Sequence, residues 1–360
     1  MHIKNINIKN VRNLKEISLD LSPGINIFYG KNAQGKTNIL EAIYFVAMGR
    51  SHRTNFYKEL ICFGENDAFI KCHLIGDLTD KFVNIHLQKE KKGISINGIT
   101  IKKMVELFGT LLVVIFSPED LNLVNAGPGE RRKFLDLNLC QLSPVYYHHL
   151  NSYYRALNQR NKLLKSIKIN RNALDTIHLW DGQIIDYGTK IINYRDNYLK
   201  SLNNIAHNFH KKITGGVESL KIIYKPNTTT DYFLKRIQAS LERDIVLGTT
   251  NVGIHKDDIT ISVNNIDVRT YGSQGQKRSS SLSLKLSGIE YIKEYGSLPV
   301  LLLDDVLSEL DEIRQTFLLN EISSLQTIIT CTGVEDILAK IRKNVSIAMY
   351  EVSEGAIEKK

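Results

Sequence analysis

The chain has 360 residues, a formal net charge of +9 and 42% hydrophobic residues, which is typical of a globular protein with two domains or one large one. It contains no apolar run long enough to span a bilayer, and its start lacks the basic and apolar blocks of a signal peptide. The four cysteines are far apart and form no CxxC pair, so we predict no zinc site or disulfide framework, and we expect a cytoplasmic protein without a membrane partner.

The first segments of the chain are predicted to be strands, followed by one helix. Apolar residues alternate over residues 3–11 and 17–21, and residues 25–29 form a short apolar strand. A glycine-rich segment follows at residues 30–37, and a helical period then marks one apolar face over residues 39–47. The local order is therefore strand, glycine loop, helix.

The next hundred residues are again rich in strands. Residues 68–74 and 82–87 alternate, and residues 94–101 predict a hairpin because Asn97 and Gly98 readily adopt the positive φ angles of a tight turn. Residues 111–116 form a continuous apolar run, which predicts a buried strand.

The middle of the chain differs in period and charge. Long amphipathic helices are predicted over residues 150–164 and 184–199, with a possible strand at 220–224. Residues 131–240 hold 18 Lys and Arg against 7 Asp and Glu, so the basic excess is concentrated here. Such a field attracts polyanions such as DNA or RNA, although a solvated lysine-rich helical surface explains the same charge.

Strands and helices alternate in the last third. We predict strand residues at 259–263 and 266–268, a helix over 277–295, a buried strand at 299–303, a helix from 311 and a strand at 327–332.

Residues 30–37 fit GxxxxGK[ST], the phosphate-binding P-loop. The residues predicted to bind ATP are Gly30, Lys31, Asn32, Ala33, Gln34, Gly35, Lys36 and Thr37. Glycines let backbone N–H groups turn toward the phosphates, and the helix that follows directs its positive end at the same charge. We expect Lys36 to reach the β and γ phosphates and the Thr37 hydroxyl to ligate Mg²⁺.

A P-loop needs a second, acidic part, which Asp304 and Asp305 provide at the carboxyl end of a predicted buried strand. Asp304 is predicted to hold Mg²⁺ through Thr37 or water, and Asp305 to orient or deprotonate the attacking water. Two aspartates after a strand are also an ordinary helix N-cap region, but the upstream P-loop favours the catalytic interpretation.

A second candidate anion-binding turn consists of Ser273, Gln274, Gly275 and Gln276 at a predicted helix start. One molecule cannot easily direct two such turns at one γ-phosphate, whereas two copies arranged head to tail can complete each other's site. A simple capped helix explains the same residues, because serine and glycine favour caps. Chemistry alone leaves both open.

A short basic run, Arg131, Arg132 and Lys133, fits DNA contacts or ion pairs at an interface. Four tyrosines, at 146, 147, 153 and 154, could stack on bases, but their helical spacing is that of packing groups. His52 and His255 are interpreted first as hydrogen-bonded structural histidines.

These motifs together resemble the ABC-type ATPases of the chromosome-maintenance (SMC) and DNA-repair group, and within that group the chain is similar to the RecF family of recombination mediators. Besides the P-loop and the acidic pair, the resemblance rests on segments along the whole chain. They are Asn10-Val11-Arg12-Asn13-Leu14, Gly49-Arg50-Ser51-His52-Arg53-Thr54, Phe116-Ser117-Pro118-Glu119-Asp120-Leu121, Arg131-Arg132-Lys133-Phe134-Leu135-Asp136, Gly253-Ile254-His255-Lys256-Asp257-Asp258, Gly272-Ser273-Gln274-Gly275-Gln276 and Ser308-Glu309-Leu310-Asp311.

The resemblance implies specific roles. Residues 273–276 match the ABC signature, which contacts the γ-phosphate of ATP held by a partner subunit, and Ser308 and Asp311 match the D-loop beside that interface. Arg12 matches a position that reaches the nucleotide in related repair ATPases. The family likeness further implies an ATP-dependent homodimer on gapped, double- or single-stranded DNA. Such a dimer would help RecR and RecO load the recombinase in DNA replication, repair and the SOS response.

We therefore predict an α/β fold, an ABC-type P-loop ATPase head with a mixed sheet from residues 1–117 and 245–360, plus a basic, mainly helical lobe of residues 118–244. Asp305 stands where most ABC proteins have the longer Glu, and no switch histidine follows the strand at 327–332, where Thr330 or Thr332 could substitute weakly. No convincing Q-loop glutamine is present, since residues 117–120 occupy the expected place. These departures predict a slow ATPase that acts as a dimerisation switch.

Two other functions share a P-loop. The ATPase subunit of a transporter would need a membrane partner, and the basic lobe, the long insertion and the missing switch histidine weigh against it. A P-loop kinase acting on a small molecule would be a monomer and would not need residues 273–276.

Overall fold

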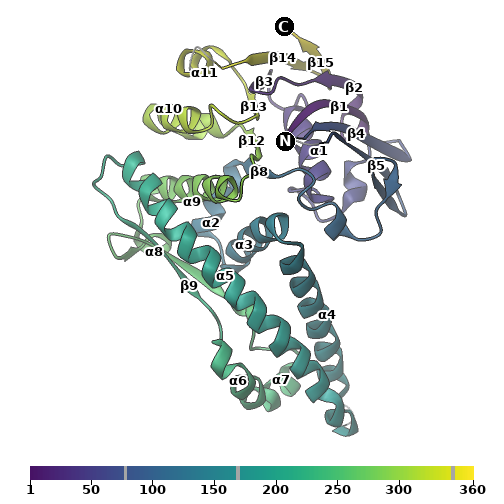
Figure 1. Ribbon diagram of the computed structural model, residues 1–360, viewed down its shortest axis with the longest axis vertical. Coiled ribbons are helices and arrows are strands. Elements are labelled where there is room, and N and C mark those ends of the chain that lie inside the picture. Colours follow the sequence, from purple (N-terminus) through teal and green to yellow (C-terminus); the bar gives the residue numbers. More distant parts are fainter. Residues whose placement is uncertain (77–78, 168–170, 342–344) are drawn as a thin grey trace. The chain divides into compact units, whose positions relative to one another are not determined.

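The computed structural model describes residues 1–76, 79–167, 171–341 and 345–360. The chain divides into two compact units, unit 1 with Met1–Asp120 and Gly288–Lys360, and unit 2 with Leu121–Ser287. Both chain ends therefore belong to unit 1 (Figure 1).

The boundary at which the chain returns to the first unit lies at Gly288, whereas the predicted boundary was residue 245. Residues 245–287 belong to unit 2 by their contacts, whereas the sequence suggested that the head resumes at residue 245. The physical reason is strand pairing, because β10 (Asp258–Val263) pairs along its length with β9 (Leu220–Lys225) in a segment that we had assigned to the helical lobe.

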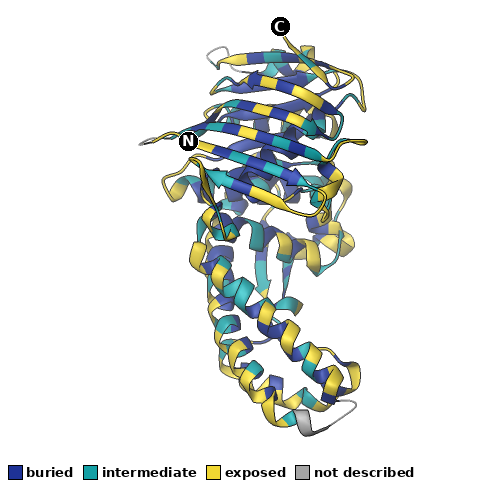
Figure 2. Cartoon of the chain, turned by 90° about the vertical axis from the view of Figure 1, so that its right-hand side faces the viewer, coloured by how far each residue is buried: buried dark blue, intermediate teal, exposed yellow. Residues whose placement is uncertain are grey.

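Unit 1 contains two six-stranded sheets. Sheet A is antiparallel, in the order β2-β1-β4-β5-β6-β7. Its strands are β1 (His2–Val11), β2 (Leu14–Asp20), β4 (Asp67–Ile75), β5 (Lys81–Gln88), β6 (Lys92–Ile96) and β7 (Ile99–Thr100). Asn97 and Gly98 form the predicted hairpin turn with φ angles of 51° and 82°. Buried and exposed residues alternate along these strands (Figure 2), which is the pattern of the sequence.

Sheet B is mixed, in the order β15-β14-β3-β13-β12-β8. Its strands are β3 (Ile25–Tyr29), β8 (Val113–Phe116), β12 (Val300–Asp304), β13 (Thr327–Cys331), β14 (Ile347–Ser353) and β15 (Ala356–Lys359). All neighbouring pairs are parallel except β14 with β15. Every residue of β12 and β13 is buried, so their apolar runs reflect a sheet covered on both faces.

Helix α1 (Lys36–Met48) lies between the two sheets. It contacts β1, β4 and β5 of sheet A and β8, β12 and β13 of sheet B. The predicted helix is confirmed, but 11 of its 13 residues are buried, rather than one face only, because each side of the helix meets a sheet. Unit 1 also holds α10 (Glu312–Glu321) and α11 (Glu335–Lys340).

Unit 2 is built on two long helices, α4 (Pro144–Ile167) and α5 (Ile177–Ile213), which pack along each other (Figure 1). A three-stranded antiparallel sheet, β11-β10-β9, packs against α5 through β9. The other elements are α2 (Asn122–Asn125), α3 (Pro128–Leu142), α6 (Phe233–Ala239), α7 (Leu241–Leu247), β11 (Ile266–Asp267), α8 (Val268–Tyr271) and α9 (Gln274–Glu294), which continues into unit 1. Val268, predicted as strand, begins α8 instead, because the Asp267 side chain caps that helix by accepting from the Thr270 N–H.

Three buried arginines hold unit 2 together. Their ion pairs join Arg131 to Asp258, Arg160 to Asp181 and Asp244, and Arg195 to Asp136 and Asp257. Tyr146 and Tyr153, which the sequence allowed as base-stacking groups, are fully buried, so they are packing residues. Breaking a buried ion pair from one side typically costs about 3–5 kcal/mol, so these networks fix the helices of this unit. No helix in the described part of the chain is long and apolar enough to cross a membrane.

Candidate nucleotide site

The P-loop turns sharply between β3 and α1, and its glycines are structurally required. Gly30 and Gly35 have φ angles of 153° and 111°, which L side chains rarely adopt. A Cβ atom on Gly30 would lie 2.3 Å from the Val352 carbonyl oxygen, and one on Gly35 would lie 2.6 Å from Asn13 Oδ1. The glycines predicted from the motif are therefore the only residues that fit this loop without displacing its neighbours.

The Lys36 side chain is folded back over the loop. Its ammonium group donates to the carbonyl oxygens of Gly30 at 2.5 Å and of Lys31 at 3.1 Å. Burial lowers the pKa of Lys36, while Asp305, Cys331 and Asp304 oppose that shift. The ammonium group therefore sits at the centre of the loop, where it can neutralise an anion.

Thr37 and Asp304 meet at the mouth of the loop, although 267 positions separate them in the sequence. Thr37 Oγ1 donates to Asp304 Oδ1 at 2.8 Å, and Thr330 Oγ1 donates to the same oxygen at 2.9 Å. The strand order explains the meeting, because β3, β13 and β12 are parallel neighbours whose carboxyl ends share one edge.

The oxygen atoms present suit Mg²⁺. A hydroxyl and a carboxylate oxygen are hard ligands, and Mg²⁺ usually takes one or two carboxylates and completes its shell with water and phosphate oxygens. No group of three or more His, Cys, Asp or Glu side chains that could hold a metal occurs among the described residues. The pair of Thr37 and Asp304 therefore fits a metal bound together with a nucleotide.

Asp305 has a left-handed backbone, with φ of 53°. Its N–H donates to Thr330 Oγ1 at 3.1 Å, so the Thr330 hydroxyl contacts both aspartates. The sequence suggested Thr330 only as a weak substitute for a switch histidine, whereas in the structure its hydroxyl bonds to both residues of the acidic pair. Thr332, the other residue considered, is exposed beyond the end of β13.

These residues surround a cavity of about 310 Å³ in unit 1. It is lined by Asn32, Ala33, Gly35, Lys36, Thr37, Asn38, Arg53, Asp304, Asp305 and Thr330. Asn38 and Arg53 were not predicted as site residues. The sequence could have pointed to both residues. Asn38 directly follows the P-loop, and Arg53 lies in the Gly49–Thr54 segment, which supported the family resemblance but was given no functional role.

Arg12 does not line this cavity. Its guanidinium forms two hydrogen bonds with Glu41, from Nε to Oε2 at 3.0 Å and from Nη2 to Oε1 at 2.9 Å, and these raise the pKa of Arg12. Glu41 also accepts from Ser51 and pairs with Arg53 at 3.6 Å. Burial alone would raise the pKa of Glu41, but the bonds from Arg12 and Ser51 lower it. The expected contact of Arg12 with the nucleotide stays a prediction, and its observed partner is this carboxylate.

The two histidines differ from each other. His255 is hydrogen-bonded as predicted, since Nε2 faces the Thr250 carbonyl oxygen at 2.9 Å and Nδ1 faces the Tyr153 hydroxyl at 2.7 Å. The carbonyl requires the ring proton on Nε2, so Nδ1 accepts. In contrast, both ring nitrogens of His52 are buried without a hydrogen-bond partner among the described residues, and its ring packs edge-on against Tyr44.

The candidate D-loop residues have local contacts. Ser308 Oγ donates to the Asp305 carbonyl oxygen at 2.6 Å, and Asp311 caps α10 by accepting from the Arg314 N–H at 3.0 Å. At the expected Q-loop place, Ser117 N–H donates to Asp120 Oδ2 at 3.1 Å in a short turn.

The candidate signature turn lies in unit 2. Ser273 Oγ accepts from the Gln276 N–H at 3.2 Å, and Gln276 Oε1 accepts from the Ser273 N–H at 3.0 Å, which is a capping box. The capped helix start that the sequence allowed is therefore present in the structure. This cap uses the Ser273 hydroxyl oxygen as an acceptor, so the hydroxyl hydrogen can still be donated to another group.

The three residues of the basic run at 131–133 have different environments. Arg131 is 3% exposed, and it binds Asp258 through two nitrogens and the carbonyl oxygens of Leu123 and Ala126. The prediction that Arg131 contacts DNA does not fit this position, because its donors are already satisfied in the interior. Arg132 is half-buried and donates to the Asp257 carbonyl oxygen, and Lys133 is exposed on the surface of α3.

Comparisons with known proteins cover nearly the whole chain. Residues 2–355 match the model of the RecF/RecN/SMC N-terminal domain family. The chain is 46% identical to the DNA replication and repair protein RecF of Lachnoclostridium phytofermentans, with 100% of both chains covered. It is 44% identical to the protein of the same name from Lachnospira eligens, with 99% of both covered.

Solved structures show the same fold. A structure of the recombination mediator RecF with ATP, from the RecFOR pathway, matches with a TM-score of 0.91 at 36% identity and covers 100% of this chain and 97% of that chain. An SMC head bound to the C-winged helix domain of ScpA matches with a TM-score of 0.60 at 15% identity, covering 100% of this chain and 97% of that one, which shows the fold alone. The predicted α/β fold of the ABC type is confirmed. Full-length relatives at 44–46% identity and a family model over nearly the whole chain show that this protein belongs to the RecF family of DNA replication and repair proteins.

Proposed function

We propose that this protein binds ATP with Mg²⁺ in the cavity between the P-loop and the carboxyl ends of β12 and β13. The observation that carries the proposal is the 2.8 Å hydrogen bond between Thr37 and Asp304, which brings the two halves of the motif together. The RecF structure solved with ATP supports the choice of nucleotide. Bound Mg²⁺ would neutralise charge on the β and γ phosphates.

The residues of this chain have separable tasks at the site. The loop N–H groups and the Lys36 ammonium hold the phosphates, Thr37 and Asp304 hold the metal, and Asp305 orients or deprotonates the attacking water. Lys36→Met should remove measurable binding of a fluorescent ATP analogue. Lys102→Met is the control, because this exposed lysine of unit 1 does not line the cavity and should leave affinity within about twofold. Equal affinity of both variants and the wild type would reject the site.

Hydrolysis is proposed to be slow. Asp305 has one methylene less than the glutamate usual at this position in ABC ATPases, and its left-handed backbone is tied to Thr330 and Ser308. The side chain is therefore short and projects from a fixed backbone, which suits a protein that keeps ATP bound as a switch. Single-turnover hydrolysis would measure the rate constant directly.

ATP is further proposed to join two copies of the chain. In that dimer the Ser273 hydroxyl of each copy donates to the γ-phosphate bound by the other, while Ser308 and Asp311 lie near the contact. Ser273→Arg should keep ATP binding and lose the ATP-dependent dimer in light scattering. An unchanged dimer would reject the shared site. A monomeric kinase, the alternative, would show no mass change with ATP.

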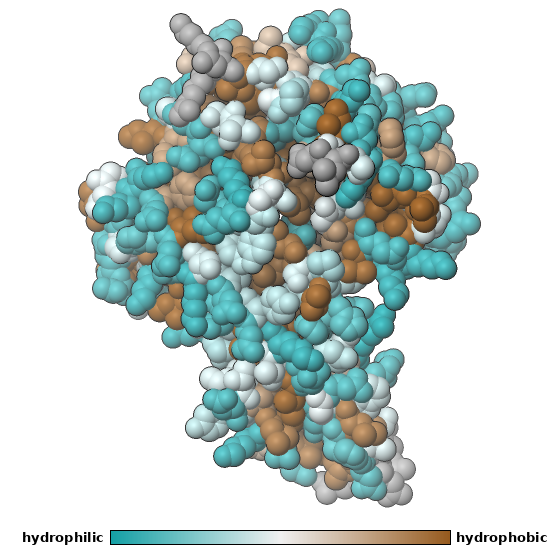
Figure 3. All heavy atoms as spheres, viewed as in Figure 1, coloured by the Kyte–Doolittle hydropathy of each residue, from teal (hydrophilic) through white to brown (hydrophobic). Residues whose placement is uncertain are grey.

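The basic surface of unit 2 supports DNA as the partner. The exposed basic residues of α4 and α5 are Arg155, Lys162, Lys165, Lys190, Lys200, Lys211 and Lys212. Figure 3 shows many hydrophilic side chains on the face that it draws, with hydrophobic ones between them. We propose that these residues bind the phosphates of gapped, double- or single-stranded DNA, with RecR- and RecO-type mediators, during loading of the recombinase. Gel shifts with a steep salt dependence would support this, and their absence would favour the transporter alternative.

A further inference from the structure

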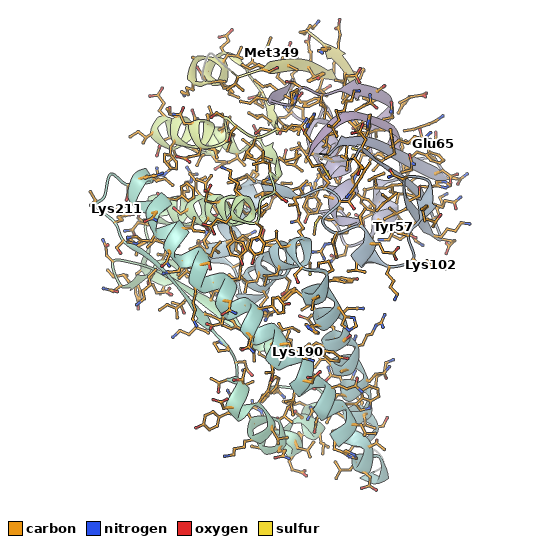
Figure 4. The ribbon with its side chains drawn as sticks, viewed as in Figure 1. Tyr57, Glu65, Lys102, Lys190, Lys211 and Met349 are labelled. Carbon is orange, nitrogen blue, oxygen red and sulfur yellow. The ribbon has the colours of Figure 1, made fainter. Side chains whose placement is uncertain are left out.

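Two titratable side chains in unit 2, His210 and Glu218, do not line the nucleotide cavity. His210 lies in the last turn of α5 and is fully buried, and Glu218 follows in the turn that leads to β9. Lys211, labelled in Figure 4, marks this end of α5. The two side chains are joined by a contact of 3.0 Å between His210 Nε2 and Glu218 Oε2.

Glu218 also binds the signature turn. Its second oxygen, Oε1, accepts from Gln276 Nε2 at 2.9 Å. The opposite end of the Gln276 amide accepts from the Ser273 N–H, so this one side chain connects the turn to Glu218. The orientation of the amide is fixed by chemistry, because a reversed amide would place its oxygen against a carboxylate and its NH₂ against an N–H.

The main chain fixes Glu218 on both sides. Gly215 and Gly216, with φ angles of 64° and 84°, reverse the chain after α5. Directly after Glu218, the Ser219 N–H donates to Asn264 Oδ1 at 2.9 Å, and the Asn264 N–H donates back to the Ser219 carbonyl oxygen at 2.9 Å. Glu218 is therefore presented to Gln276 by an anchored turn.

The chemistry of the two groups decides which atom donates in the contact between His210 and Glu218. A carboxylate carries no hydrogen, so His210 Nε2 must be the donor to Glu218. Its Nδ1 lies 3.2 Å from Ser283 Oγ on α9, and that hydroxyl also lies 2.7 Å from the Ser279 carbonyl oxygen. Burial lowers the pKa of His210, and the contact with Glu218 opposes that shift. His210 thus contacts α9 on one side and holds Glu218 on the other.

We propose that Glu218 is a positioning residue for the signature turn. It is held by His210 at the end of α5, and it fixes Gln276 and with it the Ser273 hydroxyl that meets the ATP of the second copy. This inference rests on the proposed shared site. Gln276 then acts by orienting the turn, and Ser273 makes the contact with the nucleotide.

The first test compares two substitutions of Glu218. Glu218→Ala removes the acceptor for Gln276 and should weaken ATP-dependent dimerisation, measured by sedimentation, at least tenfold, with ATP-analogue binding by the monomer within twofold of wild type. Glu218→Gln should dimerise like wild type, because its carbonyl accepts from Gln276 and its NH₂ donates to His210 Nε2 in the other tautomer. Asp175→Ala, an exposed acidic position in unit 2, is the control and should change neither quantity.

The second test exchanges the charge. Gln276→Glu places two carboxylates against each other and should abolish dimerisation, and adding Glu218→Gln should restore it, because an amide again faces a carboxylate. ATP-analogue binding by the monomer, which should stay within twofold of wild type in both variants, separates this effect from a general loss of structure. The Gln276→Glu variant and the double variant also test the role of Glu218 if Glu218→Ala fails to fold.

The outcomes separate the two proposals. A wild-type protein that stays monomeric with ATP would overturn the shared site itself. A dimerising wild type with an equally dimerising Glu218→Ala, or with no rescue by the double substitution, would overturn the role of Glu218 and leave the shared site standing.

Discussion

Thr330→Val tests whether one buried hydroxyl orders the acidic pair of the nucleotide site. The substitution keeps the shape of the side chain and replaces the hydroxyl by a methyl group at a position that is 1% exposed. It removes the donor to Asp304 Oδ1 at 2.9 Å and the acceptor of the Asp305 N–H at 3.1 Å. Both carboxylates keep their charge, so any effect comes from their orientation.

The expected size follows from these two bonds. A hydrogen bond to a charged group contributes about 1.5–3 kcal/mol, and each 1.4 kcal/mol corresponds to about a factor of ten in rate. We expect Thr330→Val to lower the single-turnover rate constant of ATP hydrolysis about 10- to 100-fold. It should also raise the Mg²⁺ concentration needed for half-maximal rate, because Asp304 is the proposed metal ligand. ATP-analogue binding through the P-loop should change far less.

Thr327→Val is the matched control for this experiment. Thr327 lies on the same strand and is fully buried, but its hydroxyl donates to the Leu325 carbonyl oxygen, away from the aspartates. It should lose stability without a specific loss of hydrolysis. If both variants hydrolyse ATP at the same rate and with the same Mg²⁺ dependence, the role assigned to Thr330 is wrong.

Three further predictions concern hydrolysis, DNA binding and pH. Asp305→Glu should raise the single-turnover rate several-fold if the short side chain limits hydrolysis, and an unchanged rate would refute that explanation. Arg131→Ala should destabilise the protein by about 3–5 kcal/mol in denaturant unfolding without altering the salt dependence of DNA binding, whereas Lys211→Ala with Lys212→Ala should reduce that slope by about 2 without loss of stability. Burial lowers the pKa of His255 from 6.5 to about 4, so the unfolded chain binds more protons in that window and stability should fall as pH drops from 6.5 to 4, by on the order of 3 kcal/mol. His255→Gln should flatten this dependence of the melting temperature, and an unchanged slope would exclude His255 as its source.

The sequence predicted most reliably those features that depend on neighbouring residues. The order of strand, loop and helix around Gly30, and the hairpin at Asn97, follow from short-range rules on periodicity and positive φ angles, and both are present in the structure. The meeting of Thr37 and Asp304 was predictable as well, because carboxyl ends of parallel strands share an edge once the strands are assigned.

Features that depend on distant partners were not predictable in the same way. Glu41 follows the P-loop at a position that helical periodicity leaves polar, and only the second sheet over α1 makes it a buried carboxylate paired with Arg12. The same limit applies to the domain boundary, which depends on β10 pairing with β9 across the chain. Thr330 had no motif of its own, since its role arises only from the neighbouring strand.

The buried arginines sharpen the argument from charge. Arg131, Arg160 and Arg195 counted toward the basic field in the sequence, but aspartates neutralise them inside unit 2, so they cannot attract DNA. The exposed basic residues on α4 and α5 are mainly lysines, of which Lys190 and Lys211 can be followed in Figure 4. Lysine is a flexible point charge, whereas arginine has the planar fork that reads guanine edges. Under the proposed function, such a lysine surface would bind phosphates without selecting bases, and ATP would set how long two copies stay on the DNA.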